Sequence, residues 1–382
     1  MKNNSDRFTG PSSFSSLGIS SAITRNLKRL DYEHPSPIQQ RAIPKALKGR
    51  DLLACAQTGT GKTAAFLLPA IERVLAQPVP DHDAPQVLVL SPTRELATQI
   101  HESFVSYARG TDLLSAVVIG GVPKARQLRE LDRSPEFLIA TPGRLVDLLE
   151  DHAVDLTHIE TLVLDEADRM LDMGFIHAVR KIVAQTPQSR QTLMFSATQA
   201  GSVAKLARSI QNDPESITVT PPSSTVDTID QSVIFVERRE KTPVLVNVLE
   251  KHDAERAIVF TRTKRGAERV AKQLVRSGIN AAAIHGNKSQ NNRRRTLERL
   301  KSGALQVLVA TDVASRGIDI DRLPLVLNFD LPNEPEDYVH RIGRTGRAEA
   351  RGAAISLCCS DEKPYLKGIE QLTKRRLKVE AA

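Results

Sequence analysis

Short apolar runs, each followed by a turn and then by a stretch with helical periodicity, recur along most of this chain. Near-continuous runs of Val, Ile and Leu that alternate with helices are typical of parallel sheets covered by helices on both faces. The first half contains DLLACA (51–56), VLVLSP (87–92), AVVIGG (116–121), FLIATP (137–142), TLVLDE (161–166) and TLMFSAT (192–198). The second half contains AIVFTRT (257–263), AAAIHG (281–286), QVLVATD (306–312), LVLNFD (325–330) and AAISLCC (353–359). We therefore predict an α/β fold in which each series of runs forms a mostly parallel sheet.

The two series are separated by a segment that is poor in helix-forming residues. Residues 213–228, DPESITVTPPSSTVDT, are rich in Pro, Ser and Thr, and the PPSST at their centre favours a linker. A chain of 382 residues is also too long for one ordinary hydrophobic core. We predict a first domain over 1–220, a linker over 221–226 and a second domain over 227–382.

Basic residues outnumber acidic ones, with a formal net charge of +8 and a pI of about 9.4. Such a balance indicates a polyanionic partner such as nucleic acid. Aromatic residues make up only 4% and Trp is absent. Few side chains can therefore stack on nucleic-acid bases, and the sugar-phosphate backbone is the expected contact. The sequence lacks a run of the ~20 apolar residues that a membrane helix needs, and its N-terminus lacks a signal-peptide core. Because Cys55, Cys358 and Cys359 form neither a metal-binding nor a disulfide pattern, we expect a cytoplasmic protein without membrane contact.

The segment AQTGTGKT (56–63) follows the first apolar run and precedes a helical stretch. A phosphate-binding loop consists of Gly, four residues and Gly-Lys-Ser/Thr, and here Ala56 replaces the first Gly. Successive amides at a helix start attract phosphate oxygens, Lys62 adds a positive charge, and the Thr63 hydroxyl is placed to hold Mg²⁺. The predicted nucleotide contacts are Gln57, Thr58, Gly59, Thr60, Gly61, Lys62 and Thr63.

Three acids, Asp165, Glu166 and Asp168, come directly after the apolar run at 161–164. Carboxylates crowded at the end of a buried strand repel one another and lose solvation, so a cation is expected beside them. Phosphate-loop enzymes hold Mg²⁺ with an acid in this place. We predict that Asp165 holds the metal and that Glu166 polarises the attacking water as a general base. The alternative is an acidic helix start, because carboxylates favour helix N-termini.

The order and spacing of the motifs resemble those of the DEAD-box RNA helicases. The motifs are AQTGTGKT (56–63), PTRELA (92–97), TPGR (141–144), DEAD (165–168), SAT (196–198), VLVATDVASRGIDI (307–320) and YVHRIGRTGR (338–347). The resemblance extends from about Phe14 to about Glu370, and DEADRMLDMGF with RIGRTGRAEARGAAISLCCSDE is most similar to the bacterial RhlE-like subgroup. It implies two tandem RecA-like domains, ATP and Mg²⁺ as cofactors, and RNA as the partner.

An N-terminal segment from Phe14 to Gln39 is similar to the family's Q motif. The resemblance implies that Gln39 bonds adenine, whose N6/N7 edge matches the donor and acceptor of its amide. It also implies that Tyr32 stacks on the base, that His34 lies beside it and that Phe14 supports the site. Asp31 stands where the family usually has Gly.

The resemblance assigns charge and ribose contacts to the second domain. Arg344 and Arg347 align with arginine fingers, whose planar guanidinium groups suit the spread charge of a transferring phosphoryl group. With Lys62, Asp165 and Glu166 they complete the predicted catalytic set. His340 and Arg341 align with residues that couple the two domains, and Asp319 aligns with an acid that bonds the ribose.

The remaining motif positions resemble RNA contacts. Small hydroxyls, glycine amides and arginines bind phosphates and sugars without reading bases. In the first domain the predicted contacts are Pro92, Thr93, Arg94, Gly121, Thr141 and Arg144. In the second they are Arg262, Gly286 and Thr311, with Gln290 and Arg293 as further candidates. Ser196 and Thr198 resemble the motif that couples hydrolysis to strand separation.

Together these implications predict an RNA-dependent ATPase that remodels short RNA duplexes and RNA–protein complexes by ATP-driven closure of two domains. A DNA- or protein-directed motor with the same ATPase core is one alternative, and a non-hydrolysing RNA clamp is the other. We expect a monomer that binds RNA without sequence specificity. Ribosome assembly and RNA decay are open pathways, and the sequence does not specify the target RNA.

Overall fold

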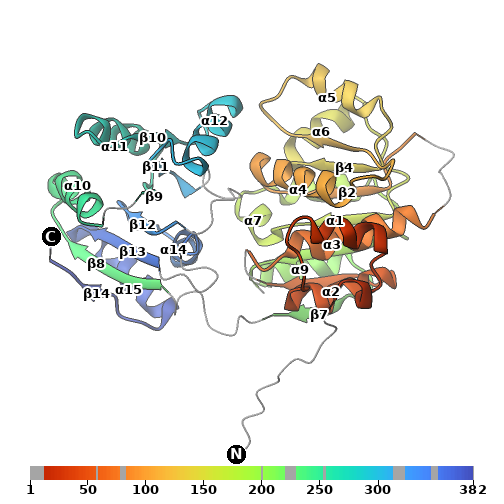
Figure 1. Cartoon of the computed structure of the whole chain (residues 1–382), viewed down its shortest axis with the longest axis horizontal. Coiled ribbons are helices and arrows are strands. Elements are labelled where there is room, and N and C mark those ends of the chain that lie inside the picture. Colours follow the sequence, from red (N-terminus) through yellow and green to blue (C-terminus); the bar gives the residue numbers. More distant parts are fainter. Residues whose placement is uncertain are drawn as a thin grey trace, which may run out of the picture. The chain divides into compact units, whose positions relative to one another are not determined.

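The computed structural model describes residues 13–56, 59–77, 83–198, 201–219, 229–252, 255–312, 323–345 and 352–381. The chain divides into two compact units, Met1–Thr220 and Pro221–Ala382, and each contains one seven-stranded sheet (Figure 1). The predicted linker lies outside the described residues. Within the described ranges, no helix combines the length and the apolarity that crossing a bilayer requires.

The sheet of the first unit has the strand order β3-β4-β2-β5-β6-β1-β7, and all its pairings are parallel. Its strands are β1 (Leu52–Cys55), β2 (Val87–Leu90), β3 (Ser115–Val118), β4 (Phe137–Ala140), β5 (Thr161–Leu164), β6 (Gln191–Ser196) and β7 (Glu215–Thr218). Its helices are η1 (Ser15–Leu17), α1 (Ser21–Lys28), α2 (Pro37–Leu47), α3 (Lys62–Leu75), α4 (Arg94–Tyr107), α5 (Lys124–Leu131), α6 (Pro142–Glu150), α7 (Ala167–Asp172), α8 (Ile176–Val183) and α9 (Gly201–Ile210).

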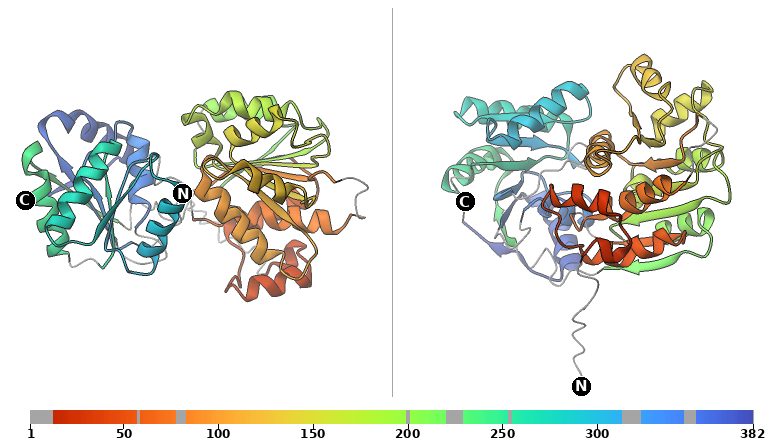
Figure 2. Two further views of the ribbon diagram at one scale, coloured as in Figure 1. Left: turned by 90° about the horizontal axis from the view of Figure 1, so that it is seen from above. Right: turned by 45° about the vertical axis from the view of Figure 1, so that its right-hand side comes forward.

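Alternate residues along these strands pack on opposite faces of the sheet, as the strand period of two requires. Val87 and Val89 join the core beneath α2, α3 and α4, whereas Leu88 and Leu90 join the core beneath α6, α8 and α9. Both faces are therefore covered (Figure 2). Each of the six predicted runs contains a strand. The edge strand β7 was not predicted, because only Ile217 in it is buried.

The second unit repeats this architecture with the strand order β10-β11-β9-β12-β13-β8-β14, again with parallel pairings. Its strands are β8 (Ile229–Phe235), β9 (Ala257–Phe260), β10 (Ala281–Ile284), β11 (Val307–Ala310), β12 (Leu325–Asn328), β13 (Gly352–Cys358) and β14 (Lys378–Val379). Its helices are η3 (Arg238–Glu240), α10 (Lys241–Lys251), α11 (Lys264–Arg276), α12 (Gln290–Lys301), α14 (Pro335–Ile342), η4 (Ser360–Glu362) and α15 (Lys363–Thr373).

Helices α10 and α11 cover one face of the second sheet, and α12, α14 and α15 cover the other. All five predicted runs contain strands, but β8 and β14 were not predicted. In β8 the first residue, Ile229, is followed by the polar residues Asp230, Gln231 and Ser232, and β14 is a two-residue edge strand with exposed side chains. The fold class, two tandem RecA-like domains with parallel sheets, is confirmed.

Candidate functional sites of the two units

The motifs of the first unit meet at the carboxyl edge of its sheet. Parallel strands end at one edge, and open α/β sheets bind ligands there. Register places Cys55 of β1 opposite Ser196 of β6, and Leu164 of β5 opposite Met194 of β6. The phosphate loop, the acids after β5 and the segment after β6 are therefore neighbours.

The phosphate loop enters α3 through a left-handed turn. Gly59 and Gly61 have φ values of 79° and 89°, and a Cβ on Gly61 would lie 2.4 Å from Nε2 of Gln39. The left-handed backbone therefore favours glycine at position 61, and a side chain there would also displace the Gln39 amide. Lys62 is buried, and its Nζ donates to the Ala56 carbonyl at 3.0 Å. Thr63 is half-buried in the first turn of α3, while Gln57 and Thr58 lie outside the described residues.

Gln39 binds the phosphate loop directly. Its Nε2 donates to the Gly61 carbonyl at 3.0 Å, and its Oε1 accepts from the Ser36 N–H at 2.8 Å. The Ser36 hydroxyl donates to the Thr60 carbonyl at 2.7 Å. The amide keeps one hydrogen and one lone pair for a nucleotide base, so the adenine contact of Gln39 stays a prediction.

The other Q-motif residues divide into exposed and buried positions. Tyr32 is 38% exposed, and its ring meets Tyr107 edge-on at 6.2 Å between centroids. His34 is exposed, whereas Phe14 is 1% exposed within the core. Asp31 has a φ of 59°, which explains why Gly suits this position and why Asp, which tolerates left-handed backbone, can replace it.

Asp165 is a buried carboxylate in an acidic surrounding. Burial raises its pKa to about 6; the Lys62 charge opposes that rise, and the nearby charges of Glu166 and Asp168 add to it. Its Oδ1 accepts the backbone N–H of Glu166 at 3.0 Å. A divalent cation would relieve the remaining cost of ionisation.

Glu166 is held in an unusual conformation beside an arginine that the sequence reasoning missed. Its φ and ψ are both 52°, a left-handed backbone that non-glycine residues rarely adopt and that concentrates at functional sites. Its Oε2 pairs with Nη1 of Arg169 at 2.5 Å, and both side chains are less than 10% exposed. Arg169 follows Glu166 by three residues, and residues with that spacing share a helix face. This spacing is the sequence signal that indicates the ion pair.

Asp168 connects the acidic motif to the segment after β6. Its Oδ2 accepts the N–H groups of Ala197 and Thr198, each at 3.0 Å. Ser196 is 1% exposed, and its hydroxyl donates to the Thr198 carbonyl at 2.7 Å. The predicted catalytic and coupling motifs are thus joined by hydrogen bonds in one unit.

The residues present fit a magnesium ion. Mg²⁺ prefers hard oxygen ligands and usually binds through one or two carboxylates, phosphates and waters rather than an all-protein cage. The Asp165 carboxylate and the Thr63 hydroxyl provide such oxygens, and burial disfavours an uncompensated charge on Asp165. No group of three or more His, Cys, Asp or Glu side chains that could hold a metal occurs in the described ranges.

The predicted RNA contacts of the first unit gather around residues 120–122. The guanidinium of Arg94 lies so close to Gly121 that a Cβ there would be 2.1 Å from its Nη1. Arg144 donates from Nη1 to the Val122 carbonyl at 3.0 Å. Thr93 and Thr141 are buried N-cap residues of α4 and α6, and Pro92 is buried beside them. These positions share the carboxyl edge with the phosphate loop, because β2 and β4 are adjacent strands.

Arg262, a predicted RNA contact of the second unit, is held by a carboxylate that was not predicted. Its Nη2 pairs with Oε1 of Glu362, and its Nε donates to the Leu331 carbonyl at 3.1 Å. Glu362 is 1% exposed and also pairs with the buried Lys241 at 2.5 Å. Burial would raise the pKa of Glu362, but the hydrogen bond and charge of Lys241 outweigh it and the pKa lies below its ordinary value. Of the other predicted contacts, Gly286 is exposed and Thr311 is buried after β11.

Arg341 is an internal residue of the second unit. Its guanidinium makes a bidentate pair with Asp312, at 2.6 and 2.7 Å, and donates to Oδ1 of Asn328 at 3.0 Å. The Arg341 side chain is only 2% exposed. Its role in coupling the two domains stays a prediction, and a side chain buried to this degree would act through Asp312. His340 and the buried Arg344 belong to the same segment.

Two predicted site residues of the second unit, Asp319 and Arg347, lie outside the described residues.

A family model described as DEAD/DEAH box helicase matches residues 36–206, and one described as helicase conserved C-terminal domain matches residues 240–349. The ATP-dependent RNA helicase CshA of Limosilactobacillus reuteri is 42% identical over 366 residues, which are 95% of this chain and 72% of that protein. The ATP-dependent RNA helicase DeaD of Escherichia coli K12 is 44% identical over 362 residues, which are 94% of this chain and 57% of that protein.

Among solved structures, Dbp5 of S. cerevisiae bound to RNA and ADP BeF3 is 30% identical, with a TM-score of 0.86 over 97% of this chain and 96% of that chain. Mss116p bound to ssRNA and AMP-PNP is 27% identical, with a TM-score of 0.88 over 100% of this chain and 81% of that chain. The two matched family models span more than half of the chain, and its match to CshA covers more than two thirds of that relative. This chain belongs to the DEAD-box family of ATP-dependent RNA helicases.

Proposed function

We propose that the first unit binds Mg-ATP and carries the general base, and that Arg344 and Arg347 of the second unit supply the arginine fingers for RNA-stimulated hydrolysis. The observation that carries this proposal is the meeting of Lys62, Asp165 and Glu166 at the carboxyl edge of the first sheet. In this fold class that edge is where nucleotides bind.

Each residue of the first unit has a separate task in this proposal. The amides from Gly59 to Thr63 and the Lys62 ammonium bind phosphate oxygens. Thr63 and Asp165 would hold Mg²⁺, which neutralises phosphate charge when bound. Glu166 accepts the proton of the attacking water, and its ion pair with Arg169 orients the carboxylate.

The hydrogen bonds of Asp168 to the Ala197 and Thr198 amides support a mechanical connection between hydrolysis and RNA. A change at the acidic motif reaches Ser196 and Thr198 through these bonds. We propose that bound ATP and RNA both favour closure of the two units, so that each ligand raises the affinity for the other. Closure would then separate short duplexes locally.

The remaining parts of the proposal rest on the sequence pattern. They are the domain boundaries 1–220, 221–226 and 227–382, membership of the RhlE-like subgroup, a cytoplasmic location and a monomeric state. Ribosome assembly and RNA decay are the proposed pathways, which RNA crosslinking in cells with a slowly hydrolysing variant would distinguish.

Phosphate release measured with RNA and with single-stranded DNA of equal length tests the proposal. We expect RNAs of different sequence to stimulate hydrolysis about equally and DNA to stimulate it poorly, because the 2′-hydroxyl is what distinguishes the two backbones. Equal stimulation by DNA would indicate a DNA-directed motor. Tight RNA binding without phosphate release would indicate a clamp.

A further inference from the structure

A concave, strongly basic surface lies along α11 of the second unit. We call it the α11 groove: a depression of about 510 Å³ between that helix and the residues that follow β10. Every side chain that lines it is charged or polar, and five are cations: Lys264, Arg265, Arg269, Lys272 and Arg276. None of these five belongs to the predicted nucleotide or RNA contacts.

The positive charge of the groove is not neutralised from within. Glu268 is the only acid in the lining, and its carboxylate already accepts bonds from His285 at 2.7 Å and Lys288 at 2.5 Å. The hydrogen bond from Lys288, together with that from His285, lowers the pKa of Glu268 despite its partial burial. Over the described ranges, the four cations from Arg265 to Arg276 have no ion pair, and all four are exposed.

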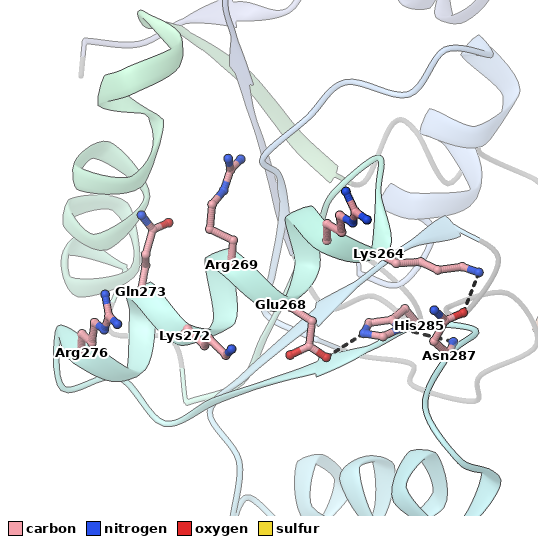
Figure 3. Close-up of a pocket in the computed structure, with 9 residues that line it drawn as sticks. Lys264, Glu268, Arg269, Lys272, Gln273, Arg276, His285 and Asn287 are labelled. Atoms are coloured by element: carbon pink, nitrogen blue, oxygen red, sulfur yellow. Dashed lines mark hydrogen bonds and ion pairs between the residues drawn. The ribbon is translucent and has the colours of Figure 1, made fainter.

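The cations form a track that begins beside a predicted RNA contact. Nζ of Lys264 donates to Oδ1 of Asn287 at 2.9 Å and lies 3.7 Å from where a Cβ on Gly286 would be. Figure 3 shows Glu268 pointing from α11 toward His285, Lys264 reaching toward Asn287, Arg269 extending from the other side of the helix, and Arg276 at the end of the helix. From Lys264 to Arg276 the helix rises about 18 Å, which is the length of roughly five nucleotides at about 3.4 Å per nucleotide of one strand.

We propose that the α11 groove binds the phosphates of RNA that extends past Gly286, and so lengthens the RNA-binding surface of the second unit. Arginines and lysines without interleaved aromatic side chains match a sugar-phosphate backbone rather than unstacked bases. Protein interfaces, in contrast, are depleted of Lys and enriched in aromatic anchors at their cores, and this lining has no aromatic anchor except the His285 ring that Glu268 binds. The inference rests on the proposed RNA-stimulated ATPase.

The test is a triple variant, Arg269→Gln, Lys272→Gln and Arg276→Gln, which leaves the residues beside Gly286 unchanged. Gln has nearly the helix propensity of Arg and Lys, so α11 should persist. The matched control removes three exposed cations outside the groove, one on α15 and two at or beside the edge strand β14: Lys367→Gln, Arg376→Gln and Lys378→Gln. RNA-stimulated phosphate release is measured with a 6-nucleotide and a 20-nucleotide RNA at two salt concentrations.

We expect the groove variant to keep the parent maximal rate with both RNAs and the parent KM for the short RNA. Its KM for the long RNA should rise about 20-fold at 50 mM salt. Three lost phosphate contacts should reduce the log–log salt slope for the long RNA by about 2, so the gap between parent and variant shrinks roughly 20-fold at 200 mM salt.

Three outcomes would overturn the proposal: an unchanged KM for the long RNA, an equal rise for both RNA lengths, or an equal rise in the control variant. An unchanged KM would leave an acidic protein as the partner of the groove. Absence of RNA stimulation in the parent protein would instead refute the proposed function.

Discussion

Replacing Asp165 with Asn should stabilise the metal-free protein while removing its activity. Burial, opposed by Lys62 and assisted by Glu166 and Asp168, raises the pKa of Asp165 from 3.8 to about 6. At about 1.36 kcal/mol for each pH unit, the ionised carboxylate costs the folded first unit about 3 kcal/mol. Asn has the same shape and keeps an oxygen that can accept the Glu166 N–H. We therefore expect the free energy of unfolding to rise by about 3 kcal/mol at pH 8.

The pH dependence has a definite sign. Because the folded-state pKa of Asp165 lies above its unfolded value, the cost is absent below about pH 4 and complete above about pH 7. The advantage of the Asn variant should therefore fall to about half at pH 5. For a unit of this size the gain at pH 8 corresponds to roughly 6–12 °C in Tm.

Thermal and urea unfolding in EDTA at pH 5 and pH 8 measure this difference, and phosphate release confirms the loss of activity. The control is Asp168→Asn, which should destabilise the unit, because Asp168 accepts backbone N–H groups from Ala197, Thr198 and Arg169 and a carboxylate accepts such bonds more strongly than an amide does. An Asn variant at position 165 that is no more stable than the parent at pH 8, or whose advantage does not shrink at pH 5, would refute the argument from burial.

Three further predictions concern the site and its support. Glu166→Gln should nearly abolish hydrolysis while ATP and RNA binding persist, because Gln cannot accept the proton of water; slow release of RNA from the variant in ATP is the measurement, and a parent-like off-rate would contradict it. Arg344→Ala with Arg347→Ala should lower turnover by roughly 10³–10⁵-fold with an unchanged circular dichroism spectrum. A fragment of residues 1–220, which lacks both arginines, should bind Mg-ATP, and RNA should not stimulate its hydrolysis. Glu362→Ala should destabilise the second unit by about 3 kcal/mol in urea unfolding, because it removes the nearer of the two carboxylates that pair with the buried Lys241 ammonium and leaves only Asp330 at 3.5 Å.

The strand–helix units could be predicted because buried parallel strands are continuous apolar runs. All eleven predicted runs contain strands, whereas β7, β8 and β14 were missed. These three segments are strands because they pair with β1, β13 and β8, respectively. Their own residues include too many polar side chains to indicate burial on both faces.

The chemical groups at the strand ends can be identified from the sequence, because each motif from Lys62 to Arg344 is a short contiguous segment. The partners of those groups depend on the fold. Asp168 binds amides 29 and 30 residues away, and Arg262 pairs with Glu362 across 100 residues. Such contacts depend on which strands lie side by side and on how deeply each charge is buried, and local periodicity carries neither quantity.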